Sequence, residues 1–260
     1  MTSDSKPEGI PAATIIIFRN APAGGPPEVL MTIRSQGMAF AGGMAVFPGG
    51  RVDPADFALG EDIAATHGLS TDEAAHQIAA VRETLEETGL ALGLAGDIDA
   101  ARAAAARAML ARTGALAPVL AEFGWQLDLA QITPFARWFP KNENIPRVYD
   151  TRFYLANLGT GAVEVSIDHA ENTHLFWTSA QGALEAAARG TIKLIFPTRR
   201  NLERIALFAS YEEARAQAEA IPVRTIVPQV DTSGDQPMLR IMADAGYPIT
   251  AELLENVARG

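Results

Sequence analysis

The chain has 260 residues and contains no cysteine. This absence excludes disulfide bonds, thiolate nucleophiles and metal sites built from cysteine. A chain of this length buries enough apolar surface to fold without covalent cross-links. A protein without cysteine is compatible with a reducing compartment, and we expect it to be cytoplasmic.

Long hydrophobic runs are absent as well. No stretch approaches the roughly 20 apolar residues that are needed to span a bilayer. The N-terminal sequence MTSDSKPEG lacks the basic and then apolar order of a secretion signal, and we expect residues 1–10 to be a disordered lead. The sequence therefore predicts no membrane association.

Positive charge is scarce: the chain has 21 lysines and arginines but 31 acidic residues, which gives a formal net charge of −10. An extended nucleic-acid surface needs clustered positive charge, so this class of partner is not expected. An acidic protein can still bind an anionic small molecule if a divalent cation bridges the two.

Strands and helices are expected to alternate along residues 11–260, as in one α/β domain with a mixed sheet covered on both sides. From Thr71 to Gly89 the apolar residues recur at helical spacing, with a capping serine or threonine before them. Residues 53–70 are polar and mixed, and are interpreted as an insertion. The expected strands are 12–19, 29–34, 44–47, 132–139, 147–155 and 175–177, and the other expected helices are 97–112, 116–123, 179–189, 198–208 and 211–220.

The helix from Thr71 carries Glu83, Glu86 and Glu87 on one face, opposite its apolar residues. We therefore expect these carboxylates to project away from the core. A solvated helix face is the plain alternative. However, like charges at this spacing repel one another, and the C-terminal end of a helix disfavours anions. A divalent cation would neutralise the cluster, and Mg²⁺ or Mn²⁺ suits ligands that are all oxygen.

A second element, the segment Phe47-Pro48-Gly49-Gly50-Arg51, follows an expected short strand. Taken alone, it is only a tight turn. Beside the glutamates, it could offer a backbone carbonyl to a metal and let a phosphate approach closely, because glycine has no side chain.

Together these residues resemble the Nudix box, G-x5-E-x7-R-E-U-x-E-E-x-G-U, in which U is a bulky apolar residue. Gly50 matches its first glycine. The second half of the box is matched by Arg82, Glu83, Glu86, Glu87, Gly89 and Leu90. The resemblance implies a Nudix-type α/β/α sandwich, here with extra C-terminal helices. It also implies a metal-dependent hydrolase.

The chain departs from this pattern in three ways. Between Gly50 and Arg82 lie 31 residues, where the pattern has 13, so 18 are inserted. Thr84 stands where an apolar residue is usual. Counting back from Arg82 places the first glutamate of the box at Ala74, and Glu73 is one position out of register. An interrupted box resembles the branch typified by the peroxisomal coenzyme A diphosphatases.

The resemblance implies roles for individual residues. Glu83, Glu86 and Glu87, together with the carbonyl of Gly49, would hold Mg²⁺ or Mn²⁺. Arg82 would orient Glu83 through a charge-assisted hydrogen bond. The general base would be Glu83 or Glu171, although Glu171 also fits an ordinary polar loop. The residues expected to bind substrate are Gly50, Arg51, Arg147 and Arg152, although Arg147 and Arg152 also fit ordinary rim charges on paired strands.

The implied reaction is hydrolysis of a pyrophosphate bond in a nucleoside diphosphate linked to another moiety, with coenzyme A or acyl-coenzyme A favoured. Two alternatives stay open. One is a pyrophosphatase acting on nucleoside triphosphates, ADP-ribose or NADH, and the other is a nucleotide-sensing module without catalysis. The insertion could be a lid, a passive loop or a contact in a homodimer.

Overall fold

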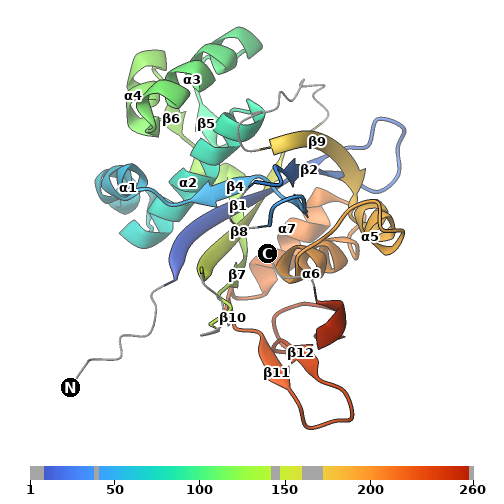
Figure 1. The fold of residues 1–260 in the computed structure, drawn as a ribbon. Coiled ribbons are helices and arrows are strands. Elements are labelled where there is room, and N and C mark those ends of the chain that lie inside the picture. Colours follow the sequence, from blue (N-terminus) through green and yellow to red (C-terminus); the bar gives the residue numbers. More distant parts are fainter. Residues whose placement is uncertain (1–8, 38–40, 142–146, 160–171, 258–260) are drawn as a thin grey trace, which may run out of the picture.

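An eight-stranded mixed sheet forms the centre of the computed structural model, which describes residues 9–37, 41–141, 147–159 and 172–257 (Figure 1). The strands run in the order β10-β7-β8-β1-β2-β3, while β4 pairs with β1 and β9 with β2. β1 is parallel to β8 and β10 to β7, and the other pairs are antiparallel. The strands are β1 (Ile10–Arg19), β2 (Glu28–Arg34), β3 (Ala45–Val46), β4 (Gly49–Arg51), β7 (Ile132–Trp138), β8 (Tyr149–Asn157), β9 (Asn172–Ser179) and β10 (Thr225–Ile226).

Helices and short strands complete the described part of the chain. None of the helices there combines the length and hydrophobicity that crossing a bilayer requires. The α-helices are α1 (Pro54–His67), α2 (Thr71–Thr88), α3 (Ala100–Thr113), α4 (Leu116–Phe123), α5 (Ala180–Ala188), α6 (Phe196–Ile205) and α7 (Tyr211–Ala220). The two smaller sheets consist of β5 (Leu94–Ala95) with β6 (Gln126–Leu127), and of β11 (Gln229–Asp231), β12 (Met238–Arg240) and β13 (Ala251–Leu253). The 3-10 helices are Leu129–Gln131 and Leu254–Asn256.

Both faces of the sheet are buried, and this explains why the sequence of β1 is continuously apolar. Ile15 and Ile17 belong to a core that includes side chains of α2, α3 and α4, whereas Ile16 and Phe18 belong to a second core with α6 and α7. Successive side chains of a strand point to opposite faces, so a strand buried on both sides needs an unbroken apolar run. The predicted sandwich of helices around a mixed sheet is thereby confirmed (Figure 1).

The limits of α2 agree with the sequence prediction. The Ser70 side chain accepts a hydrogen bond from the backbone N–H of Glu73, which caps the N-terminus. The helix ends at Gly89, whose φ of 77° is the left-handed conformation that glycine adopts without strain. The predicted apolar face is fully buried: Ala74, Ile78, Val81 and Leu85.

Helix α1 is a difference from the sequence prediction, which placed no regular element between residues 53 and 70. Asp53 caps the helix, Pro54 opens it, and Gly68 ends it in a left-handed conformation. The helix packs closely on α2, since a Cβ atom on Gly60 would lie 3.0 Å from the backbone nitrogen of Ala75. The inserted segment is therefore a structural neighbour of the helix that carries the glutamates.

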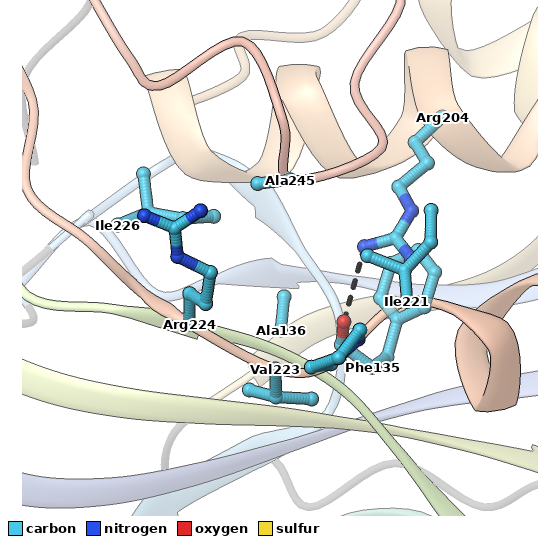
Figure 2. A pocket seen from close by; sticks show the side chains of 9 residues that line it. Phe135, Ala136, Arg204, Ile221, Val223, Arg224, Ile226 and Ala245 are labelled. Atoms are coloured by element: carbon cyan, nitrogen blue, oxygen red, sulfur yellow. Dashed lines mark hydrogen bonds between the residues drawn. The ribbon is translucent and has the colours of Figure 1, made fainter.

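A small pocket lies on the opposite face of the sheet, between β7 and the C-terminal segment (Figure 2). Arg204 and Arg224 lie on either side of it. The buried Arg204 donates to the carbonyl of Phe135 at 3.0 Å and to Gln217, and its guanidinium stacks over the Phe135 ring. Arg224 forms an exposed ion pair with Asp244. Because its arginines are engaged by the protein itself, we interpret the pocket as a packing feature.

Candidate active site

Gly49 and Gly50, the first two residues of β4, lie directly against the C-terminal half of α2. Gly49 has a φ of 151°, and a Cβ atom there would overlap the carbonyl oxygen of Ala13. A Cβ atom on Gly50 would overlap the carboxylate of Glu83. Both positions therefore require glycine, one for its backbone and the other because Glu83 fills the space that a side chain would need.

Arg82 is the charged centre around which the acidic residues gather. Its side chain is only 4% exposed. It donates to Glu83 Oε1 at 2.9 Å, more distantly to Glu86 Oε2 at 3.4 Å, and to the backbone carbonyl of Arg51 at 2.8 Å. Burial alone would lower the pKa of Arg82, but the hydrogen bond with Asp56 and the surrounding negative charges outweigh it and raise that pKa. The hydrogen bond expected between Arg82 and Glu83 is thus present.

Asp56 is the partner that the sequence analysis missed. Its two carboxylate oxygens accept hydrogen bonds of 3.0–3.2 Å from Nε and Nη2 of Arg82, and Asp56 is 1% exposed. Counting back from Arg82 had placed the first acidic residue of the box at Ala74. Counting forward from Gly50 places it at Asp56, which follows Gly50 by the five intervening residues of the pattern. The forward count was the signal that could have identified it.

Glu87 is buried, which corrects the expectation that the glutamates project away from the core. Its Oε2 accepts from the backbone N–H of Gly49 at 3.0 Å, and its Oε1 accepts from Nδ2 of Asn172 at 3.1 Å. Glu87 is 2% exposed. The helix face opposite the apolar residues is partly covered by β4 and β9, so Glu83 and Glu87 point into the protein, whereas Glu86 is partly exposed.

The carboxyl group of Glu83 has a raised pKa. Burial is the main reason why the pKa of Glu83 is raised to about 8 in the metal-free protein; the negative charges of Glu87 and Glu86 add to this rise, and Arg82 opposes it. Several carboxylates are thus held close together around one buried arginine. This is the electrostatic condition under which a cation is bound.

We expect the stability of the metal-free protein to fall as the pH rises from about 4.5 to about 8, because Glu83 keeps its proton in the folded state while the unfolded chain loses it at its ordinary value of 4.5. The contribution should be roughly 2–4 kcal/mol, present below this window and lost across it. Denaturant unfolding in a chelator between pH 4.5 and 8.5 measures it. The Glu83→Gln variant should show a flatter profile, and equal slopes in the two proteins would contradict the raised pKa.

The donor set suits Mg²⁺ or Mn²⁺, since Glu83, Glu86 and Glu87 offer only oxygen. Within the described residues, no three acidic or histidine side chains are already gathered in the arrangement of a metal site. The hydrogen bonds account for this: Arg82 holds oxygens of Glu83 and Glu86, while Gly49 and Asn172 hold those of Glu87. The residues fit a divalent ion chemically, and the carboxylates would turn toward it on binding.

The predicted substrate-binding arginines lie in different places. Arg152 forms ion pairs with Asp72 and Glu73, which belong to the first turn of α2, far along the helix from Glu83. Arg147 is exposed, and Arg51 is exposed next to Gly50. The structure therefore brings Arg51 near the glutamates but not Arg152. Glu171, the second candidate base, lies outside the described residues.

Thr84 stands where the box has an apolar residue. Its side chain is buried, and its hydroxyl group is hydrogen-bonded. Its Oγ1 donates to the carbonyl of Ala80 at 2.7 Å, one turn earlier in α2. The position is thus as buried as an apolar residue would be, and the departure leaves the helix intact.

Comparisons with known proteins agree with this geometry. No protein-family model and no curated protein matches the chain. Among solved structures, a NUDIX hydrolase from Alicyclobacillus acidocaldarius is 27% identical with a TM-score of 0.69, and the match covers 80% of this chain and 96% of that one. The NUDIX domain of Shewanella oneidensis NrtR, complexed with ADP ribose, is 13% identical over 78% and 90% of the two chains with a TM-score of 0.43. That second likeness is too weak to support a conclusion. The chain has the fold of the Nudix hydrolases, as predicted.

Proposed function

We propose that this protein is a Nudix-type hydrolase that cuts a pyrophosphate bond with the help of Mg²⁺ or Mn²⁺ held by Glu83, Glu86 and Glu87. The observation that carries the proposal is the packing of Glu83 and Glu87 against Gly49 and Gly50 of β4. There, the carboxylate of Glu83 occupies the space next to Gly50, and Glu87 binds the N–H of Gly49. The similarity in fold to the Alicyclobacillus acidocaldarius hydrolase supports the same reaction class.

Each residue has a part in this reaction. A divalent ion held by these glutamates would lower the pKa of a water molecule and stabilise the charge that develops on the bridging oxygen of the pyrophosphate. Water attacks one phosphorus, the bond from that phosphorus to the bridging oxygen breaks, and two phosphorylated products leave. Arg82 keeps Glu83 in one orientation, and Gly50 leaves the space for it. The carbonyl of Gly49 is the further metal ligand in the proposal.

The general base is proposed to be Glu83 or Glu171. Arg82 positions Glu83 through a hydrogen bond of 2.9 Å, and burial raises the pKa of Glu83 in the metal-free protein. A base must lie within hydrogen-bond reach of the attacking water. The pH–rate profile of Glu171→Gln distinguishes the two. If Glu83 is the base, the alkaline plateau persists in this variant, and if Glu171 is the base, the plateau disappears.

Our substrate proposal is a nucleoside diphosphate linked to another moiety, with coenzyme A or acyl-coenzyme A favoured. Support for coenzyme A comes from the interrupted box, in which 31 residues separate Gly50 from Arg82. The net charge of −10 and the carboxylate cluster disfavour contact with such an anion, and a bound metal would offset this repulsion.

A hydrolysis screen with Mg²⁺ and Mn²⁺, analysed by mass spectrometry, tests the proposal. The panel comprises coenzyme A, acyl-coenzyme A, NADH, ADP-ribose, dinucleoside polyphosphates and nucleoside triphosphates. Release of 3′,5′-ADP and a phosphopantetheine is the expected result. Cleavage of another diphosphate keeps the reaction class and removes the coenzyme A preference. Ligand binding without turnover would overturn the proposal in favour of a sensing module.

A further inference from the structure

Where β2 ends and β9 begins, three buried polar atoms have no hydrogen-bond partner among the residues that the structure describes. They are Oγ1 of Thr32, Nε of Arg34 and Oδ1 of Asn172. Arg34 is paired with Asn172 across the two strands, and Thr32 precedes Arg34 by two residues. Buried polar groups are nearly always paired, so three neighbouring exceptions need a common explanation.

The three side chains lie on the face of the sheet that carries the glutamates. Leu30 packs in the core with α2, and alternation along β2 places Thr32 and Arg34 on the same side as Leu30. Asn172 is fixed on that side by its hydrogen bond to Glu87. Asn172 thus contacts the candidate metal ligand Glu87, and Arg34 is the residue that pairs with Asn172 across the strands.

The guanidinium of Arg34 has a donor that the protein does not use. Within the residues that the structure describes, its Nε atom has no hydrogen-bond partner. By contrast, Arg137 is paired with Asp150 and Arg152 with Asp72 and Glu73. A cluster of glutamates repels an anionic ligand, so a positive charge that no carboxylate neutralises is what such a ligand requires.

We infer that Arg34 and Thr32 bind a phosphate group of the substrate and that Asn172 completes this subsite. The inference rests on the proposed function and adds residues to it. Nε of Arg34 and the hydroxyl of Thr32 donate to phosphate oxygens, a geometry that suits a guanidinium group. Oδ1 of Asn172 accepts from a hydroxyl or a water molecule that accompanies the ligand, while its Nδ2 stays bound to Glu87.

The Arg34→Met variant tests this subsite, because methionine keeps much of the side chain's length without its charge or donors. We expect its KM for the diphosphate identified in the screen to rise about 10- to 100-fold, with a smaller change in kcat. Arg34→Lys should recover part of this loss. The thermal unfolding midpoint should not fall, since the buried Nε has no partner to lose. Arg112→Met, which removes one exposed positive charge from α3, is the matched control.

Calorimetric titration with inorganic pyrophosphate separates this inference from the proposed function. If the wild-type protein turns over a diphosphate and Arg34→Met has an unchanged KM, the inference is overturned and the function stands. If the wild type hydrolyses nothing but binds pyrophosphate more tightly than Arg34→Met, the inference stands and the function falls. Equal pyrophosphate binding by the two proteins, or none by either, overturns the inference.

Discussion

Replacing Glu86 with glutamine is expected to lower kcat/KM about a thousandfold. A divalent ion contributes several kcal/mol to the stabilisation of charge in such a reaction, and about 4 kcal/mol corresponds to three orders of magnitude. Glu86 is the most exposed of the three glutamates at 37%, and its contact with Arg82 Nη1 is long at 3.4 Å. The substitution should therefore leave the fold intact and remove a metal ligand.

Steady-state kinetics in saturating Mg²⁺, together with Mn²⁺ binding followed by electron paramagnetic resonance, measure this effect. Glu122→Gln, an exposed glutamate at the end of α4, is the matched control and should behave as the wild type. Turnover by the Glu86→Gln variant at the wild-type level would remove Glu86 from the metal site. A large loss of activity with unchanged Mn²⁺ affinity would assign it another role.

Replacing Asp56 with asparagine is expected to destabilise the protein by about 3–5 kcal/mol, because it leaves the buried guanidinium of Arg82 without its main counter-charge. Asp56 accepts from both Nε and Nη2 of Arg82, and both side chains are almost fully buried. The remaining carboxylates, Glu83 and Glu86, would then be drawn further toward Arg82. We therefore expect activity to fall along with stability.

Denaturant unfolding at pH 7 gives the loss of stability directly. Asp62→Asn removes an exposed carboxylate from the same helix and should change the free energy of unfolding by less than about 0.5 kcal/mol. If Asp56→Asn proved as stable as Asp62→Asn, the ion pair with Arg82 would contribute nothing to holding α1 on α2.

Strong local signals made most of the fold predictable. In α2 the apolar spacing, the Ser70 cap and Gly89 all specify the same helix, and the structure has it from Thr71 to Thr88. In β1 the unbroken apolar run identifies a strand buried on both faces. These features depend on residues that are close in sequence, which is why the sequence alone was sufficient.

Helix α1 escaped prediction because its fully buried residues are not large apolar ones. They are Asp56, Gly60 and Ala64, spaced at intervals of four, while Phe57, Leu59 and Ile63 are only partly buried against the core. No hydrophobic stripe marks such a helix. Asp53 before Pro54 and Gly68 at the end were the available signals, since they are favoured at helix starts and ends.

The candidate site was predictable in its residue types but not in its surroundings. Helical spacing placed Glu83, Glu86 and Glu87 on one face, but nothing in that spacing shows that β4 and Asn172 cover Glu87. Likewise, the partners of Arg152 lie about 80 positions earlier in the chain. Contacts between distant segments depend on the packing of the whole domain, which local patterns do not encode.

The position of the insertion has a consequence for chain entropy. Asp56 keeps its spacing from Gly50, so the additional residues fall in the segment of 25 residues between Asp56 and Arg82, where the family pattern has 7. Closing the longer loop costs only about 1 kcal/mol more, because the closure entropy grows with the logarithm of length. The two ends of that loop are joined by the Asp56–Arg82 ion pair, and the added residues fold into helical structure packed within it. A loop anchored in this way can change in length between related proteins while the two halves of the box stay in place.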